Sequence, residues 1–173
     1  MEVRLSTAGI AAQVERLAAV LRRGGDRIAT AESCTGGLIA AACTSLAGSS
    51  DWFERGFVTY SNDAKSEMLG VPAALIAAHG AVSAEVACAM AEGALANSRA
   101  SFAVSVTGIA GPDSDDTQKP VGLVHFAAAS RTGQFAHVEK KFGNPGRSEI
   151  RKRSVLQAFV MLHDLAEKEP ANS

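Results

Sequence analysis

The segment TAESCTGGLIAAACTSLAG, residues 30–48, passes from a β-prone run through two glycines into a long apolar stretch. A short strand over 27–31, a turn, and a mostly buried helix over 36–46 explain this order of residue types. Such a turn exposes one side chain at the edge of a sheet, here Ser33, and leaves backbone N–H groups that can hold an anion. The local sequence alone favours an ordinary turn in which the hydroxyl of Ser33 or Thr35 caps the helix.

Helical and strand patterns alternate along the rest of the chain. The predicted helices cover 7–23, 84–98 and 147–168, and the further predicted strands cover 52–61 (a strand or a hairpin), 101–108, 121–130 and 135–142. The last two strands flank RTGQ, which predicts an antiparallel hairpin. These elements predict an α/β fold, a three-layer α/β/α sandwich on a mixed β-sheet. We expect a single domain over residues 1–173, with a frayed end after about residue 169.

Composition and charge narrow the function classes. Hydrophobic residues make up 47% of the chain and charged residues 20%, which fits a globular protein with a buried core. The formal net charge of −1 provides no general basic face, so no nucleic-acid partner is expected. No apolar run is long enough for a membrane span, and the start of the sequence has no signal-peptide pattern. We expect a cytoplasmic protein without a membrane partner.

The three cysteines, Cys34, Cys43 and Cys88, form no CxxC pair, and no Cys/His cluster has the spacing of zinc ligands. An odd number of cysteines without framework spacing fits reduced thiols in the cytosol. Cys43 and Cys88 lie in alanine-rich helical runs, which predicts core positions. The sequence therefore predicts neither a metal site nor another cofactor.

Ser33 needs a base beside it to become a nucleophile. No serine of this chain lies in a GxSxG motif, so the hydrolase nucleophile elbow is excluded. A lysine can be the base when burial lowers its pKa, and Lys65 in TYSNDAKSEMLG is the candidate. Tyr60 ends a predicted strand and Lys65 lies in the helical turn that follows, so both side chains could enter one cleft. The alternative is a solvated lysine beside a core tyrosine.

A second glycine-rich turn, VTGIAGP, ends the predicted strand over 101–108. It lacks the terminal Gly-Lys-Ser/Thr of a phosphate-binding P-loop. This turn and the turn at Ser33 could face each other across a ligand, since both follow buried strands. Arg147 lies at the start of the last predicted helix, where a cation is unfavourable without an anionic partner. It shares a helix face with Arg151, so a phosphate clamp and a surface charge run both fit.

Six blocks of the sequence carry most of these motifs: AESCTGGLIA, GSSDWFERGFVTYSNDAKSEMLGV, HGAVSAEVACAMAEGAL, VSVTGIAGP, KPVGLV and GRSEIR. Together, in this order, they resemble the CinA C-terminal domain family and cover most of residues 28–153. The resemblance implies a nicotinamide-nucleotide amidase, which hydrolyses the carboxamide of nicotinamide mononucleotide to nicotinate mononucleotide and ammonia in pyridine nucleotide salvage. It also implies catalysis without metal by a serine, a tyrosine and a lysine, with a small pyridine nucleotide as the partner.

Matched residue by residue, the implied catalytic groups are Ser33, Tyr60 and Lys65. The implied ligand pocket uses further positions of the same blocks, namely Thr35, Gly36, Gly37, Asn62, Thr107, Gly108, Ala110 and Arg147. In the implied scheme Lys65, neutral in the pocket, takes the Ser33 proton directly or through Tyr60. The N–H groups of 36–37 would then hold the oxyanion, and Arg147 would bind the 5′-phosphate.

One loop departs from the family pattern. Asp113, Ser114, Asp115 and Asp116 stand where many relatives have a glycine-rich stretch. Negative charge at this place is expected to weaken the binding of an anionic nucleotide unless the loop points outward.

Rival interpretations stay open beside the serine amidase. Cys34 is a second candidate nucleophile, although its position one residue beyond Ser33 would turn it inward. A non-catalytic nucleotide-binding or regulatory module, or an amidase for a different small amide, would keep the same pocket. The alanine-rich helices could also pack against a second copy of the chain, and we expect a homo-oligomer, with a dimer favoured.

Overall fold

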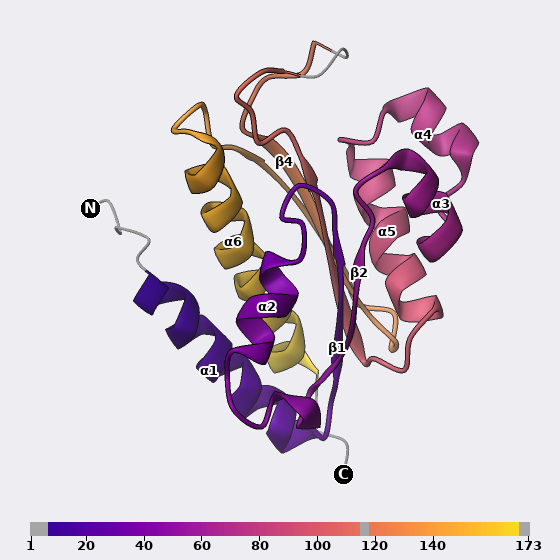
Figure 1. Ribbon diagram of the computed structural model, residues 1–173. Coiled ribbons are helices and arrows are strands. Elements are labelled where there is room, and N and C mark those ends of the chain that lie inside the picture. The colour runs from indigo at the N-terminus through magenta and orange to yellow at the C-terminus, as the bar shows by residue number, and fades with distance from the viewer. Residues whose placement is uncertain (1–6, 115–117, 170–173) are drawn as a thin grey trace.

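Five strands form one sheet in the order β2-β1-β3-β4-β5 (Figure 1). A computed structural model of the chain describes residues 7–114 and 118–169. Its elements are α1 (Thr7–Gly24), β1 (Ile28–Glu32), α2 (Leu38–Thr44), the 3₁₀ turn η1 (Ser49–Asp51), β2 (Phe53–Val58), α3 (Asn62–Leu69), α4 (Ala73–His79), α5 (Ala84–Ala96), β3 (Phe102–Gly108), β4 (Leu123–Ser130), β5 (Phe135–Lys141) and α6 (Arg147–Lys168).

The sheet is mixed and covered on both faces, so the predicted three-layer α/β/α sandwich is confirmed. β1 runs parallel to β2 and β3, whereas β3, β4 and β5 pair antiparallel, with β4 and β5 as the predicted hairpin. Helices α1, α2 and α6 cover one face and α3, α4 and α5 the other (Figure 1). Each face buries its own apolar cluster, because successive side chains along a strand point to opposite faces.

The helix predicted over 36–46 begins two residues later than expected, at Leu38. Gly36 and Gly37 adopt left-handed backbone angles, with φ of 58° and 103°, and therefore belong to the turn. The prediction that Ser33 or Thr35 caps this helix is wrong. Instead, the buried carboxylate of Glu32, at the end of β1, accepts hydrogen bonds from the N–H groups of Ile39 (2.9 Å) and Ala40 (3.1 Å).

The carboxyl ends of the three parallel strands meet at one edge of the sheet. The Ser33 N–H group donates to Val106 O on β3 (2.9 Å), and the Thr59 N–H group donates to Glu32 O (2.9 Å). The segments that follow β1, β2 and β3 are therefore neighbours at this edge. Crevices at such an edge are the usual ligand sites of open α/β sheets.

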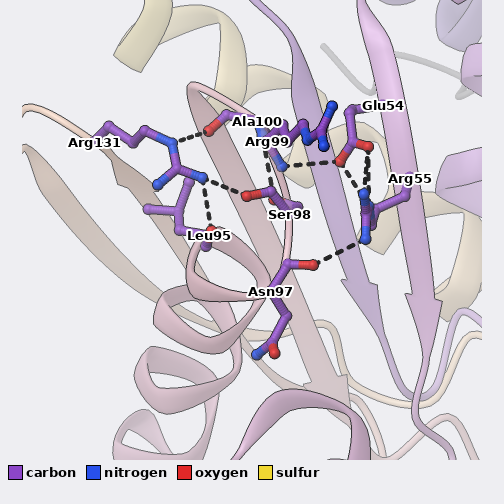
Figure 2. A network of polar contacts seen from close by, with 8 residues as sticks. All are labelled: Glu54, Arg55, Leu95, Asn97, Ser98, Arg99, Ala100 and Arg131. Carbon is purple, nitrogen blue, oxygen red and sulfur yellow. Dashed lines mark hydrogen bonds and ion pairs between the residues drawn. The ribbon is translucent and has the colours of Figure 1, made fainter.

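At the other end of the strands, where β2 and β3 begin, a polar network holds the loops together (Figure 2). The Arg131 guanidinium donates to the carbonyls of Leu95 (2.8 Å), Ser98 (2.6 Å) and Ala100 (2.7 Å), which end α5 and lead into β3. Arg55 at the start of β2 donates to Asn97 O in the same loop (3.1 Å). This network ties the β4–β5 turn and β2 to the end of α5.

Replacing Arg131 by alanine should lower the free energy of unfolding by about 1–2 kcal/mol, because three carbonyls lose a charged donor. Urea unfolding followed by circular dichroism measures this change. Arg16→Ala on the exposed side of α1 is the matched control and should change stability by less than about 0.5 kcal/mol. Equal midpoints for the two variants would contradict the prediction.

Within residues 7–114 and 118–169, no helix has both the length and the apolar character that crossing a bilayer requires.

Candidate active site

A cavity of about 260 Å³ opens at the carboxyl edge of β1, β2 and β3. Its lining comes from the turn after β1, from the start of α3, from the loops after α4 and β3, and from the first residue of α6. The lining residues are Ser33, Cys34, Tyr60, Asn62, Lys65, Ala81, Val82, Thr107, Gly108, Ile109, Ala110, Gly111, Asp113, Ser114 and Arg147. The cavity thus brings together both glycine-rich turns and both members of the Tyr60–Lys65 pair.

Lys65 lies in the first turn of α3. Ser61 caps this helix, and its Oγ accepts a hydrogen bond from the Ala64 N–H group (3.0 Å). This helix start turns the lysine inward, and its side chain is only 1% exposed. Its Nζ lies 3.0 Å from Ser33 Oγ and 2.9 Å from Thr59 O. The expected alternative, a solvated lysine, is therefore wrong.

Burial of Lys65 makes its neutral amine accessible near neutral pH, facing the serine. Burial lowers the pKa of Lys65 from 10.5 to about 8. A neutral amine keeps two N–H donors and one lone pair. The carbonyls of Thr59 (2.9 Å) and Tyr60 (3.5 Å) can accept the two N–H bonds, which leaves the lone pair for the Ser33 hydroxyl. This is the arrangement of a nucleophile beside its base.

Ser33 is held in a tight turn whose backbone is tied on two sides. Its carbonyl accepts from the Gly36 N–H group (3.0 Å). From α6, Arg151 Nε donates to Cys34 O and Nη2 to Thr35 O, each at 3.1 Å. The hydroxyl of Ser33 stays accessible from the cavity, although the residue as a whole is only 9% exposed.

Tyr60 is far more exposed than a core tyrosine, at 62% of its possible surface. Its hydroxyl accepts a hydrogen bond from Arg147 Nη2 (3.1 Å), and Arg147 Nη1 donates to Gly111 O (2.7 Å). Arg147 is the first residue of α6. At the rim of the cavity, its guanidinium therefore links Tyr60, which follows β2, to Gly111 in the loop after β3.

The loop after β3 forms the opposite wall. Thr107 Oγ1 donates to Ala81 O (2.8 Å), and this bond ties the loop after α4 to the end of β3. Lys119 Nζ donates to Val82 O in the same loop (2.6 Å). Gly108 and Ala110 follow Thr107 along the cavity lining.

The other residues expected at the site are divided between the cavity and its surroundings. Asn62 lines the cavity at the start of α3. Thr35, Gly36 and Gly37 do not line it, because the turn carries them behind Ser33 toward Arg151 and α2, and we assign them no ligand contact. Asp113 and Ser114 do line the cavity, so this part of the acidic loop faces inward. Asp115 and Asp116 lie outside the described residues.

Cys34 is a poor candidate nucleophile in this geometry. Burial raises the pKa of its thiol to about 12, so its thiolate is strongly disfavoured near neutral pH. The residue is only 6% exposed. Cys43 is fully buried as expected, whereas Cys88 is only partly buried.

Sequence reasoning missed Glu32 and the turn contacts of Arg151. A carboxylate that caps a helix from the preceding strand has no fixed spacing signal, although Glu32 stands directly before the serine. The helix face shared by Arg147 and Arg151 was a usable signal, but it did not identify the carbonyls that Arg151 binds. Ala81 and Val82 were also not predicted at the site, because only the fold brings them to the cavity.

Known proteins carry the same fold and motifs. The profile of the CinA C-terminal domain matches residues 10–166, nearly the whole described chain. The chain belongs to the CinA C-terminal domain family. Nicotinamide-nucleotide amidohydrolase PncC of Escherichia coli K12, a related protein, is 47% identical over 148 residues, 86% of this chain and 89% of that protein.

Solved structures of the CinA superfamily share the fold. The competence/damage inducible protein CihA from Agrobacterium tumefaciens superposes with a TM-score of 0.89 and 51% identity, covering 91% of this chain and 95% of that chain. A CinA superfamily protein from Klebsiella pneumoniae gives a TM-score of 0.88 at 32% identity, covering 92% of this chain and 99% of its own. The resemblance inferred from the sequence motifs is confirmed.

Proposed function

We propose that this chain is a nicotinamide-nucleotide amidase, which hydrolyses the carboxamide of nicotinamide mononucleotide to nicotinate mononucleotide and ammonia. The observation that carries the proposal is the 3.0 Å contact between Ser33 Oγ and the buried Lys65 Nζ inside a cavity. The PncC relative, 47% identical, supports the choice of substrate.

The reaction begins with proton transfer from Ser33 to neutral Lys65 as Oγ attacks the carboxamide carbon. The direct route is favoured over a relay through Tyr60, whose hydroxyl is engaged with Arg147. Collapse of the tetrahedral intermediate breaks the C–N bond as the Lys65 ammonium protonates the departing amide nitrogen, which leaves as ammonia. Water then attacks the acyl-serine ester, gives its proton to Lys65, and releases the acid as Ser33 regains its proton.

The oxyanion needs N–H donors that face the cavity. The Gly36 N–H group, an expected donor, is already bonded to Ser33 O, and Gly37 does not line the cavity. We assign the role to the N–H group of Cys34, because this residue directly follows the nucleophile and is one of those that line the cavity. The residue after a nucleophilic serine supplies an oxyanion donor in other serine hydrolases.

Substrate binding relies on Arg147 and its surroundings. Its guanidinium, at the rim of the cavity beside Tyr60 and Gly111, is the group that binds the 5′-phosphate. Asn62, Thr107, Gly108 and Ala110 contribute the remaining polar and backbone contacts. Asp113 faces the same cavity, so its negative charge reduces the affinity for this anionic nucleotide.

The physiological setting follows from the reaction. Conversion of a pyridine nucleotide amide to the acid and ammonia belongs to pyridine nucleotide salvage in the cytoplasm. The proposed enzyme uses no metal or other cofactor in this scheme, and we propose that it acts as a homo-oligomer, with a dimer as the simplest form.

Ammonia release from nicotinamide mononucleotide by the purified chain tests the function directly, with nicotinate mononucleotide identified as the second product. Turnover supports the amidase. Binding of the nucleotide, seen as thermal stabilisation without ammonia, would identify a non-catalytic nucleotide-binding module. Failure to bind or turn over the nucleotide would point to an amidase for a different small amide.

The rate should rise with pH, because only neutral Lys65 can accept the serine proton. With a pKa of about 8, kcat/KM should increase about tenfold per pH unit below pH 8 and level off above it. The measurement is kcat/KM for ammonia release from pH 6 to 10 at constant ionic strength. A profile that is flat or falling between pH 6.5 and 8 would contradict Lys65 as the base.

A further inference from the structure

We propose that Arg151 is a positioning residue of the amidase reaction, which fixes the peptide groups that follow the nucleophile Ser33. The proposal rests on the proposed function for its kinetic part. Its structural part, that Arg151 immobilises the turn, stands on the contacts alone.

Both side-chain hydrogen bonds that Arg151 makes in the described structure go to the nucleophile turn. Nε donates to Cys34 O and Nη2 to Thr35 O, each at 3.1 Å, across 116 residues or more of sequence. Its guanidinium also lies over Gly36, where an added Cβ would come within 3.5 Å of Nη2. A planar guanidinium that donates to two successive carbonyls fixes both their position and their orientation.

The turn needs such a restraint because two of its residues are glycines. Gly36 and Gly37 are in left-handed conformations, and glycine has wide conformational freedom in this region. A planar trans peptide directs its N–H group opposite to its C=O group. By holding the Cys34 and Thr35 carbonyls on the α6 side, Arg151 therefore directs the N–H groups of Thr35 and Gly36 away from α6. The Gly36 N–H group then closes the turn onto Ser33 O.

Glu32 holds the other end of the same turn. Its buried carboxylate binds the first free N–H groups of α2, at Ile39 and Ala40. Without Arg151, the start of α2 stays fixed by Glu32, and the Thr35 carbonyl keeps the N–H group of Leu38 (3.1 Å) as a donor. The Cys34 carbonyl loses its Arg151 donor, so the Cys34–Thr35 peptide is the one that is released. Arg151 is thus required for the turn and not for the core, which α6 reaches through other residues such as Ile150 and Phe159.

The kinetic test compares Arg151→Ala, Arg151→Lys and Arg153→Ala. Arg153 lies half a turn away on α6 and pairs with Glu149 (3.0 Å), so it is the matched control. Arg151→Ala should lower kcat for nicotinamide mononucleotide about 10- to 100-fold with KM changed less than about threefold, because small misplacements of reacting groups have effects of this size. Arg151→Lys should recover part of the loss, and Arg153→Ala should match the wild type. A loss confined to KM, or equal rates in the two alanine variants, would overturn the proposal.

Cysteine labelling tests the structural part without any turnover. Cys34 on the turn and Cys43 in the core are both buried, so each alkylates slowly in the folded protein. In Arg151→Ala, iodoacetamide should modify Cys34 at least about fivefold faster while the Cys43 rate stays unchanged, since only the turn opens. Equal acceleration at both cysteines, which would place the effect in the core as well as the turn, or no acceleration at either, would overturn the proposal. If the wild type releases no ammonia, the proposed function fails while this result still decides the role of Arg151.

Discussion

Ser33→Ala should reduce ammonia release from nicotinamide mononucleotide by at least about 10⁴-fold, because the reaction then lacks its nucleophile. The lost hydroxyl is the one that lies 3.0 Å from Lys65 Nζ. The fold should persist, since the backbone bonds of Ser33 to Val106 and Gly36 do not involve the side chain. Initial rates measured with coupled ammonia detection, together with a thermal unfolding curve, give both results.

Cys34→Ala is the matched control for this variant. Its thiol, with a pKa raised to about 12, should contribute nothing as a nucleophile, so the rate should stay within about threefold of the wild type. Turnover above about 1% of the wild-type rate in Ser33→Ala would remove the serine from the mechanism. If Cys34→Ala also lost activity, the cysteine would take its place.

Much of the fold was predictable because it depends on local periodicity. The apolar spacing over 147–168 predicted α6 with its observed bounds, and the runs around RTGQ predicted the β4–β5 hairpin. The start of α2 was predicted two residues too early, because glycines fit both a helix start and a left-handed turn. The local sequence does not determine which of the two conformations Gly36 and Gly37 adopt.

The sequence predicted several of the residues that line the cavity, but not their environments. Ordinary hydropathy buries tyrosine and exposes lysine, whereas here Lys65 is 1% and Tyr60 62% exposed. The Ser61 cap starts α3 at Asn62, and this start directs the Lys65 side chain inward. Composition does not reveal where the helix begins or which way the lysine points. The hydrogen-bond partners of Arg147 and Arg151 lie on other elements. The helix spacing could therefore indicate that the two arginines share a face of α6, but not which groups they bind.

Lys65→Met should abolish turnover and at the same time stabilise the protein. Loss of the base should lower kcat by at least about 10³-fold, since Ser33 then has no group to accept its proton. Methionine keeps the length and apolar character of the side chain without a charge. We therefore expect a gain of about 1–2 kcal/mol near pH 7, after allowing for the carbonyls of Thr59 and Tyr60 that lose a donor.

The gain in stability of Lys65→Met should depend on pH, because the pKa of Lys65 differs between the folded and unfolded chain. In the wild type, burial holds the pKa of Lys65 at about 8, below its ordinary 10.5, so the unfolded chain binds more protons between these values. Wild-type stability therefore rises with pH from about 8 to 10.5, and the advantage of Lys65→Met should be full below pH 8 and shrink above it. Thermal unfolding at pH 7 and at pH 10 measures this, with the exposed Lys152→Met on α6 as control. An inactive variant that is less stable than the wild type at pH 7 would mean that the hydrogen bonds of Lys65 outweigh the cost of burying its charge, and it would contradict the prediction.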